Sequence, residues 1–250
     1  DASFVFQNRV IIGAMANKVR QAESLLMKYL FENHPVLQST EILFEGNTHR
    51  VQGKTIEGGD AVVLGRDLLL IGISQRTNAE AVDELIRSYL EQSDEELTVL
   101  AVVLPDQRHA IHLDMILTAI DHQTLLVYRP YVEGPAALPI VRVRVSRKGR
   151  EYSRVDGLVP ELKRRGINPE IISCGGEDPV FQQREQWLSG TNFFAFAPGK
   201  IIGYDCNTAT FEALKNSGFR VKTAEEVKAE PELLTDSKRL AVGIQGAELA

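Results

Sequence analysis

Apolar runs and polar turns alternate between residues 60 and 104 in a way that predicts one compact unit. Two short apolar runs, "AVVLG" and "LLLIGIS", flank Gly65-Arg66-Asp67 and are typical of a β-hairpin. A helix is expected next, because Thr77 and Glu80 have the spacing of a capping box and an apolar stripe at helical spacing follows them. The run "TVLAVVL" then predicts a further strand, so the unit is strand, strand, helix, strand.

The same order of elements recurs along the chain. The opening gives "SFVF", "RVIIGA", the helix "VRQAESLLMKYLFEN" and the strand "EILFEG". From residue 113 come "LDMILTAID", "TLLVYR" and, after a long excursion, the helix "LVPELKRRG" and "EIISC"; from 192 come "NFFAFA", "IIGYD", the helix "TATFEALKNSG" and "FRVKT". Gly166 and Gly218 stand where helix C-caps are expected, and "RLAVGI" at 239–244 is interpreted as one strand of a fifth unit. Because one unit buries little apolar surface alone, the copies are expected to pack around a shared axis.

Polar side chains stand just before the first strand of each unit. These are Asp1, Asp60, Asp114 and Asn192, and Glu57 lies close to Asp60 in "IEGGD". Such residues often precede strands for reasons of turn geometry alone. Their equivalent positions in successive repeats instead favour convergence at one end of the axis, which predicts a mouth containing Glu57 and Asp60.

Composition and charge narrow the class of protein. The chain has 250 residues, 44% hydrophobic and 25% charged, with a net charge of -6. These values are typical of a globular protein that binds neither nucleic acid nor an anionic membrane, and the apolar runs are too short for a membrane span. With two cysteines, which we interpret as free thiols, we expect a cytoplasmic protein and leave its oligomeric state open, a homo-oligomer included. Because the first residue is Asp1 rather than Met, we expect a segment of a longer protein.

The chemistry of the predicted mouth comes from "HLD" and two arginines. In an extended chain His112 and Asp114 point to the same side, so an imidazole suited to proton transfer shares the mouth with carboxylates. Arg20 and Arg76 each lie 19 residues beyond an acid of the mouth, Asp1 and Glu57 respectively, and can clamp a carboxylate. A metal is the less favoured ligand, because the arginines oppose a cation. A pocket with acids at one end and arginines at the other fits the zwitterion L-arginine.

These residues resemble the guanidine-modifying (pentein) superfamily, and most closely bacterial arginine deiminase. The resemblance covers nearly the whole chain and is carried by "EGGD" with "IGISQRT", "HLD", "CGGEDPVFQQREQWLSGTN", "APGKIIGYD" and "GAEL". It implies an α/β fold, a five-bladed pseudo-symmetric propeller of ββαβ units, with about four blades and part of a fifth in residues 1–250. It also implies hydrolysis of the small molecule L-arginine to citrulline and ammonia, without a cofactor, through a cysteine thiouronium.

The resemblance further implies a role for each site residue. Asp1 and Asp114 grip the guanidinium, His112 is the general acid and base, and Glu57 orients both guanidinium and histidine. Arg20 and Arg76 bind the substrate carboxylate.

Two features depart from the family pattern. Neither Cys174 nor Cys206 matches the family's nucleophile, which is expected in a loop beyond Ala250, and an N-terminal module is expected before Asp1. Residues 1–250 are thus interpreted as an incomplete catalytic propeller domain that forms no citrulline alone. An amidinotransferase and a catalytically silent binding module remain the alternatives, and agmatine remains an alternative substrate.

Overall fold

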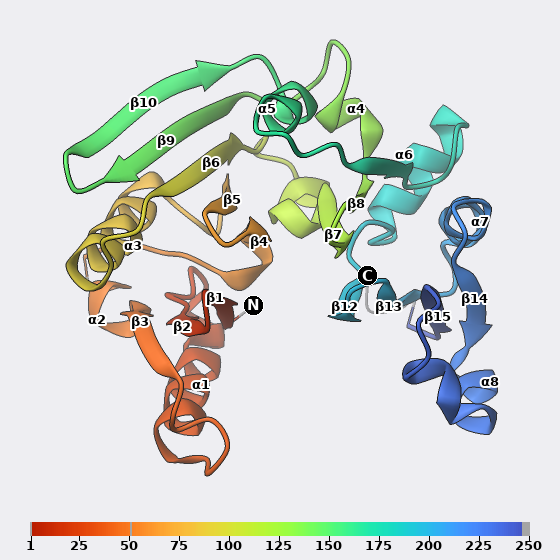
Figure 1. Ribbon diagram of the computed structural model, residues 1–250, viewed down its shortest axis with the longest axis horizontal. Coiled ribbons are helices and arrows are strands. Elements are labelled where there is room, and N and C mark those ends of the chain that lie inside the picture. The colour runs from red at the N-terminus through yellow and green to blue at the C-terminus, as the bar shows by residue number, and fades with distance from the viewer. Residues whose placement is uncertain (1, 51, 247–250) are drawn as a thin grey trace. The chain divides into compact units, whose positions relative to one another are not determined.

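The computed structural model describes residues 2–50 and 52–246. The chain divides into two compact units, one made of Asp1–Leu113 with Pro139–Val155 and the other of Asp114–Leu138 with Asp156–Ala250. Each unit contains two of the expected strand, strand, helix, strand repeats, so the chain is a mixed α/β protein (Figure 1).

The first repeat forms a three-stranded sheet. Its hairpin turns at Gln7 and Asn8, whose φ angles of 52° and 62° are those of a tight two-residue turn between antiparallel strands. The chain then passes through the helix and returns as a third strand parallel to the second. The elements are β1 (Ser3–Phe6), β2 (Arg9–Ile12), α1 (Gln21–Asn33) and β3 (Glu41–Glu45).

The second repeat forms a larger sheet than predicted. A hairpin later in the sequence, at residues 140–155, adds two strands on the β6 side of this sheet. The strand order is therefore β10-β9-β6-β5-β4 (Figure 1). The capping box expected at Thr77 is wrong, because Asn78 caps the helix by accepting a hydrogen bond from the Ala81 N–H. The elements are β4 (Ala61–Gly65), β5 (Leu68–Ile73), α3 (Ala79–Gln92), β6 (Leu97–Val103), β9 (Ile140–Ser146) and β10 (Gly149–Val155).

The second unit holds the third and fourth repeats. The third sheet has the order β11-β8-β7, and the fourth has the order β12-β13-β15-β14. The strand at 240–244 therefore lies between two strands of the fourth repeat, parallel to both, and its assignment to a fifth unit is wrong. The elements are β7 (Leu117–Asp121), β8 (Thr124–Val127), α5 (Leu158–Arg164), β11 (Glu170–Ser173), β12 (Phe194–Ala197), β13 (Lys200–Tyr204), α7 (Thr208–Asn216), β14 (Arg220–Thr223) and β15 (Leu240–Ile244).

The predicted helix C-caps at Gly166 and Gly218 are confirmed, with φ angles of 80° and 86° that favour glycine.

Shorter elements connect the repeats. The connecting helices are α2 (Gly46–Arg50), α4 (Arg129–Val132), α6 (Pro179–Trp187) and α8 (Ala224–Ala229), and the 3-10 helices are η1 (Lys18–Arg20), η2 (Gly58–Asp60), η3 (Arg108–Ala110), η4 (Leu113–Met115) and η5 (Pro231–Leu234). No helix within residues 2–50 and 52–246 is long and apolar enough to cross a membrane.

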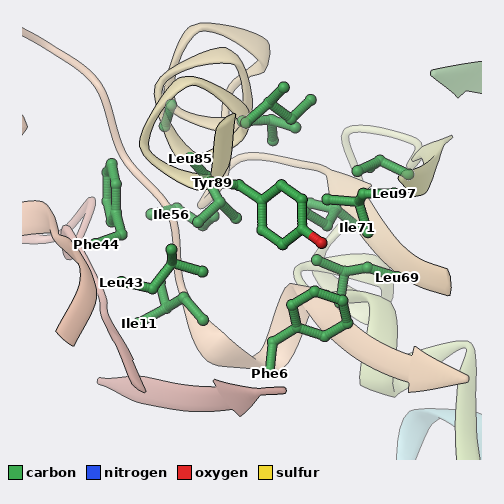
Figure 2. Packing of buried hydrophobic residues seen from close by; sticks show 14 of the residues in the cluster. Phe6, Ile11, Leu43, Phe44, Ile56, Leu69, Ile71, Leu85, Tyr89 and Leu97 are labelled. Atoms are coloured by element: carbon green, nitrogen blue, oxygen red, sulfur yellow. The ribbon is translucent and has the colours of Figure 1, made fainter. Parts of the chain in front are cut away.

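The core of the first unit fixes the segment that carries the candidate site. Tyr89 of α3 is buried beside Phe6, with their ring centroids 6.2 Å apart. Ile56 lies in the same cluster and is bridged to Ala14 by backbone hydrogen bonds, so the residue that follows it, Glu57, begins from a fixed backbone. Figure 2 shows the cluster, with labels on Phe6, Ile11, Leu43, Phe44, Ile56, Leu69, Ile71, Leu85, Tyr89 and Leu97.

Candidate active site

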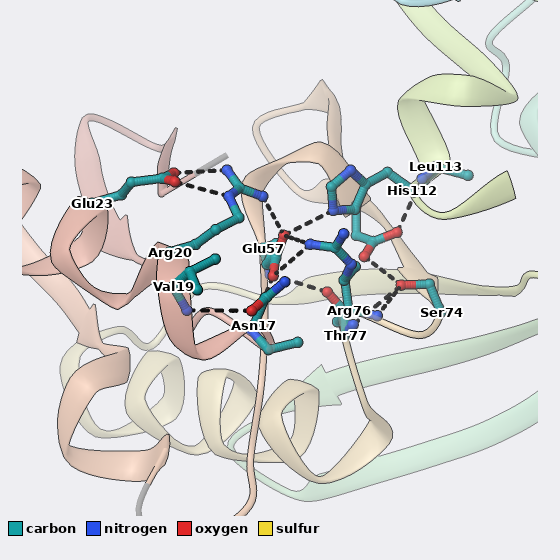
Figure 3. A network of polar contacts seen from close by, with 12 residues as sticks. Asn17, Val19, Arg20, Glu23, Glu57, Ser74, Arg76, Thr77, His112 and Leu113 are labelled. Carbon is teal, nitrogen blue, oxygen red and sulfur yellow. Dashed lines mark hydrogen bonds and ion pairs between the residues drawn. The ribbon is translucent and has the colours of Figure 1, made fainter. Parts of the chain in front are cut away.

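Glu57 is the centre of a polar network inside the first unit. Its side chain is wholly buried, at 0% exposed. Oε1 accepts a hydrogen bond from the Ala16 N–H at 3.0 Å, and Oε2 lies 3.0 Å from Arg20 Nη1, 3.3 Å from Arg76 Nη1 and 3.0 Å from His112 Nε2 (Figure 3). A buried carboxylate requires such partners, because its charge is costly to remove from water. Four groups from three segments of the chain thus converge on the Glu57 carboxylate.

The pKa of Glu57 reflects a balance between burial and the hydrogen bonds and charges around its carboxylate. Burial alone raises the pKa, but the hydrogen bond with His112, the Ala16 N–H and the charges of His112 and Arg76 together outweigh burial and lower the pKa below 4.5. Glu57 is therefore ionised at neutral pH.

The two arginines reach Glu57 from separate helix starts. Arg20 ends η1 immediately before α1, and Arg76 lies in the loop between β5 and α3. Both guanidinium groups contact the Glu57 carboxylate itself, so Glu57 does not lie apart from the arginines as expected. Both side chains remain 23% exposed, so each keeps access to solvent beside that contact. A pocket that holds the two ends of L-arginine between acids and arginines stays a prediction.

Asp60 holds together the two loops that carry Arg76 and His112. Its Oδ2 accepts a hydrogen bond from Ser74 Oγ at 2.7 Å, and its Oδ1 accepts one from the Leu113 N–H at 3.0 Å. Ser74 Oγ in turn accepts from the N–H groups of Arg76 and Thr77, at 2.9 and 3.1 Å. Asp60 is thus a positioning residue for the network around Glu57.

The space for Asp60 depends on a glycine in β5. A Cβ atom on Gly72 would clash with Asp60 Oδ1 and would lie 3.1 Å from Leu113 Cβ. Since the Asp60 side chain is fully buried, burial raises its pKa to about 6, and the hydrogen bond from Ser74 and the charge of His112 offset only part of that rise.

The "HLD" segment differs from the extended chain that was expected. Leu113–Met115 forms the 3-10 helix η4, so the alternation of an extended strand does not apply to His112 and Asp114. Asp114 belongs to the second unit, where its backbone carbonyl accepts a hydrogen bond from Thr191 Oγ1 at 2.8 Å. Its contact with a guanidinium stays a prediction, and Asp1 lies outside the described residues.

Comparison with known proteins shows the family to which this chain belongs. The family model for arginine deiminase matches residues 1–227 of the chain. The chain belongs to the arginine deiminase family. It is 32% identical over 231 residues to the arginine deiminase of Listeria monocytogenes serotype 4a, covering 88% of this chain and 54% of that protein. It is 35% identical over 217 residues to the arginine deiminase of Lactococcus lactis subsp. cremoris, covering 84% and 51%.

Solved structures of related folds resemble this arginine deiminase family chain as well. An amidinotransferase from Microseira wollei matches with a TM-score of 0.58 at 18% identity, covering 88% of this chain and 62% of that one. A mutant DDAH from Pseudomonas aeruginosa, complexed with citrulline, matches with a TM-score of 0.53 at 16% identity, covering 100% and 69%. At these identities the likeness concerns the fold alone. The chain spans about half the length of the curated arginine deiminases it matches.

The two cysteines lack the features of an activated nucleophile in an arginine deiminase. Cys174 is fully buried, with Sγ 3.6 Å from Thr210 Oγ1, and burial raises its pKa to about 12. Cys206 is partly exposed, and its pKa is also raised, by burial first and then by the charge of Asp205. Both thiols are therefore protonated at neutral pH, whereas the reactive form of a cysteine is the thiolate.

Sequence reasoning missed several members of the network. Asp60 was expected at the mouth without a chemical role, and Ser74, Thr77 and the Ala16 N–H were not expected there. A serine two residues before Arg76, in "SQRT", was the available signal, because serine hydroxyls accept hydrogen bonds from the N–H groups that follow them at helix starts.

Within the described residues no group of three or more His, Cys, Asp or Glu is arranged to hold a metal ion.

Proposed function

We propose that the protein containing this chain hydrolyses free L-arginine to L-citrulline and ammonia. The observation that supports this proposal most directly is the buried pair of Glu57 and His112, with Oε2 and Nε2 3.0 Å apart, in a member of the arginine deiminase family. A carboxylate that holds an imidazole in place favours repeated proton transfer by that imidazole.

The reaction proceeds in two covalent steps. A cysteine thiolate attacks the guanidinium carbon, His112 gives a proton to the departing nitrogen, and ammonia leaves a thiouronium on sulfur. A water molecule then attacks the same carbon, His112 accepts its proton, and the thiolate leaves to give the ureido group of citrulline. Glu57 keeps the histidine oriented and compensates its charge through both steps.

Charged residues at both ends of the substrate select arginine. In the proposal Asp1 and Asp114 grip the guanidinium, while Arg20 and Arg76 bind the α-carboxylate with charge-assisted hydrogen bonds. The exposure of 23% at each arginine side chain supports this assignment, because a ligand can reach the guanidinium groups beside Glu57.

The nucleophile in this proposal is a cysteine outside residues 1–250. Support comes from the raised pKa of both Cys174 and Cys206. The fold proposed for the complete catalytic domain is a five-bladed α/β propeller, to which this chain contributes its repeats and the carboxylates of the central site.

The test is a product assay on the full-length protein. L-arginine and water alone should give citrulline and ammonia in equal amounts, whereas an amidinotransferase would require an amine acceptor. Agmatine, which lacks the α-carboxylate, should be a much poorer substrate. Intact arginine after prolonged incubation with a folded full-length protein would refute the proposal.

A further inference from the structure

Arg20 contacts two carboxylates among the described residues, Glu57 and Glu23, and Glu23 is not part of the proposed catalytic machinery. Glu23, in the first turn of α1, accepts hydrogen bonds from Arg20 Nε at 2.9 Å and from Arg20 Nη2 at 2.7 Å (Figure 3). This is the bidentate arrangement in which the Nε and Nη2 edge of a guanidinium recognises any carboxylate. The edge that suits a substrate carboxylate is therefore occupied by a carboxylate of the chain itself.

Arg76 differs from Arg20 in this respect. Its side-chain hydrogen bonds within residues 2–50 and 52–246 run from Nη1 alone, to the two oxygens of Glu57 at 3.3 and 3.5 Å. A ligand carboxylate can meet Arg76 without displacing a bidentate partner, whereas at Arg20 it competes with Glu23.

Displacing the Glu23 carboxylate from Arg20 should cost little free energy. Its side chain is 45% exposed, so the carboxylate can turn into water when it leaves Arg20. The hydrogen bond with Arg20 is the main cause that lowers the pKa of Glu23, so the competitor carries its charge at neutral pH. Exposed ion pairs contribute little net stability, which makes such an exchange reversible.

We propose that Glu23 is a specificity-determining residue that competes with the α-carboxylate of the ligand for the Nε and Nη2 edge of Arg20. This inference rests on the proposed function, since it takes Arg20 as a residue that binds the substrate carboxylate. Its consequence is that every ligand with an α-carboxylate loses affinity to Glu23, whereas a ligand without one does not.

The experiment measures equilibrium binding by calorimetry for L-arginine, L-citrulline and agmatine. It uses the full-length protein with its nucleophilic cysteine replaced by alanine, so that L-arginine is bound and not consumed. Glu23→Gln and Glu23→Ala remove the competing charge, and we expect both to tighten arginine and citrulline about two- to fivefold while agmatine does not tighten. Citrulline separates carboxylate competition from any effect on the guanidinium, because it carries the carboxylate and no guanidinium charge. Glu23→Asp keeps the charge and should stay closer to the wild-type affinities.

A matched control removes the same charge from the same helix. Glu32→Gln lies in α1 next to Lys28 rather than Arg20, and it should leave the ratio of agmatine to arginine dissociation constants unchanged. Unchanged or weaker arginine and citrulline binding in both Glu23→Gln and Glu23→Ala would overturn the inference, as would an equal gain for agmatine. Tighter carboxylate binding, together with no citrulline from the full-length protein that keeps all its cysteines, would uphold the role of Glu23 and refute the hydrolysis. Failure of the wild type and all variants to bind arginine would overturn both.

Discussion

Replacing Glu57 by glutamine removes one charge and changes almost no volume, so it tests the network directly. The amide oxygen can still accept from the Ala16 N–H, but the amide nitrogen would then face the donors on Arg20, Arg76 and His112. The arginines can turn to solvent, being 23% exposed, whereas His112 is only 7% exposed and loses its partner in a buried place. We therefore count mainly the contact with His112 and expect a loss of about 3 kcal/mol in the free energy of unfolding.

The effect of Glu57→Gln on turnover should exceed what this instability causes. If His112 is the general acid and base, as proposed, loss of the carboxylate that orients it should lower kcat by about a hundredfold or more. Urea unfolding of the full-length protein measures the first quantity, and citrulline formation at a temperature where both proteins are folded measures the second. Glu95→Gln, which removes an exposed carboxylate paired with Arg66, is the control and should change stability by less than about 1 kcal/mol without affecting kcat.

The stability effect of Glu57→Gln should also depend on pH. Because the fold lowers the pKa of Glu57 from 4.5, its contribution is present above that value and is lost as the pH falls below it. The difference between wild type and Glu57→Gln should therefore shrink in acid. Wild-type kcat in the folded variant would refute the reasoning.

Three further predictions concern the supports of the site. Gly72→Ala places a Cβ against the Asp60 carboxylate and should destabilise the full-length protein by about 1–3 kcal/mol in urea unfolding, whereas Gly65→Ala, whose Cβ meets its nearest atoms at 3.7 and 3.8 Å, should not; equal effects would contradict the packing argument. The fold raises the pKa of Asp60 from 3.8 to about 6, so its contribution to stability is full below 3.8 and is lost as the pH rises through about 6. Relative to Asp60→Asn, the wild-type unfolding free energy should thus fall by about 3 kcal/mol between about pH 3.5 and about pH 7, and a difference independent of pH would refute this. Arg76→Ala should weaken arginine binding by ~1.5–3 kcal/mol with little change for agmatine, measured by calorimetry on the full-length protein with its nucleophilic cysteine replaced by alanine; equal losses for the two ligands would remove Arg76 from the carboxylate site.

Local pattern was enough to predict most of the repeat. Strands joined by short turns, such as β4 and β5, and helices that end at Gly166 or Gly218 are determined by nearby residues, and their bounds were close to those observed. The hairpin of β9 and β10 was missed although "IVRVRVS" alternates as a strand should, because the segment interrupts the repeat and pairs with the strand of an earlier one.

The pairing of strands that lie far apart in the chain could not be predicted from the sequence. The strand β15 lies between β13 and β14, and parallel partners are chosen by tertiary packing rather than by any turn. A single sequence shows the strand but not its neighbours.

The sequence predicted which residues form the site, but it did not predict most of the hydrogen bonds and ion pairs among them. Glu57 and His112 were expected together because of their positions in successive repeats, and the structure brings them within hydrogen-bond distance. The Ala16 N–H and the Leu113 N–H leave no signature in sequence, because every residue except proline carries that donor. The contact of both arginines with Glu57 also depends on side-chain directions that spacing does not determine.

The central claim is tested most directly by trapping the covalent intermediate. The full-length protein is quenched in acid during turnover of L-arginine, and its cysteine-containing peptides are analysed by mass spectrometry. The account predicts a thiouronium on a cysteine outside residues 1–250, with Cys174 and Cys206 unmodified, because the pKa of each of these two thiols is raised. An arginine-derived adduct on Cys174 or Cys206, or steady citrulline formation with no cysteine adduct at any quench time, would contradict it.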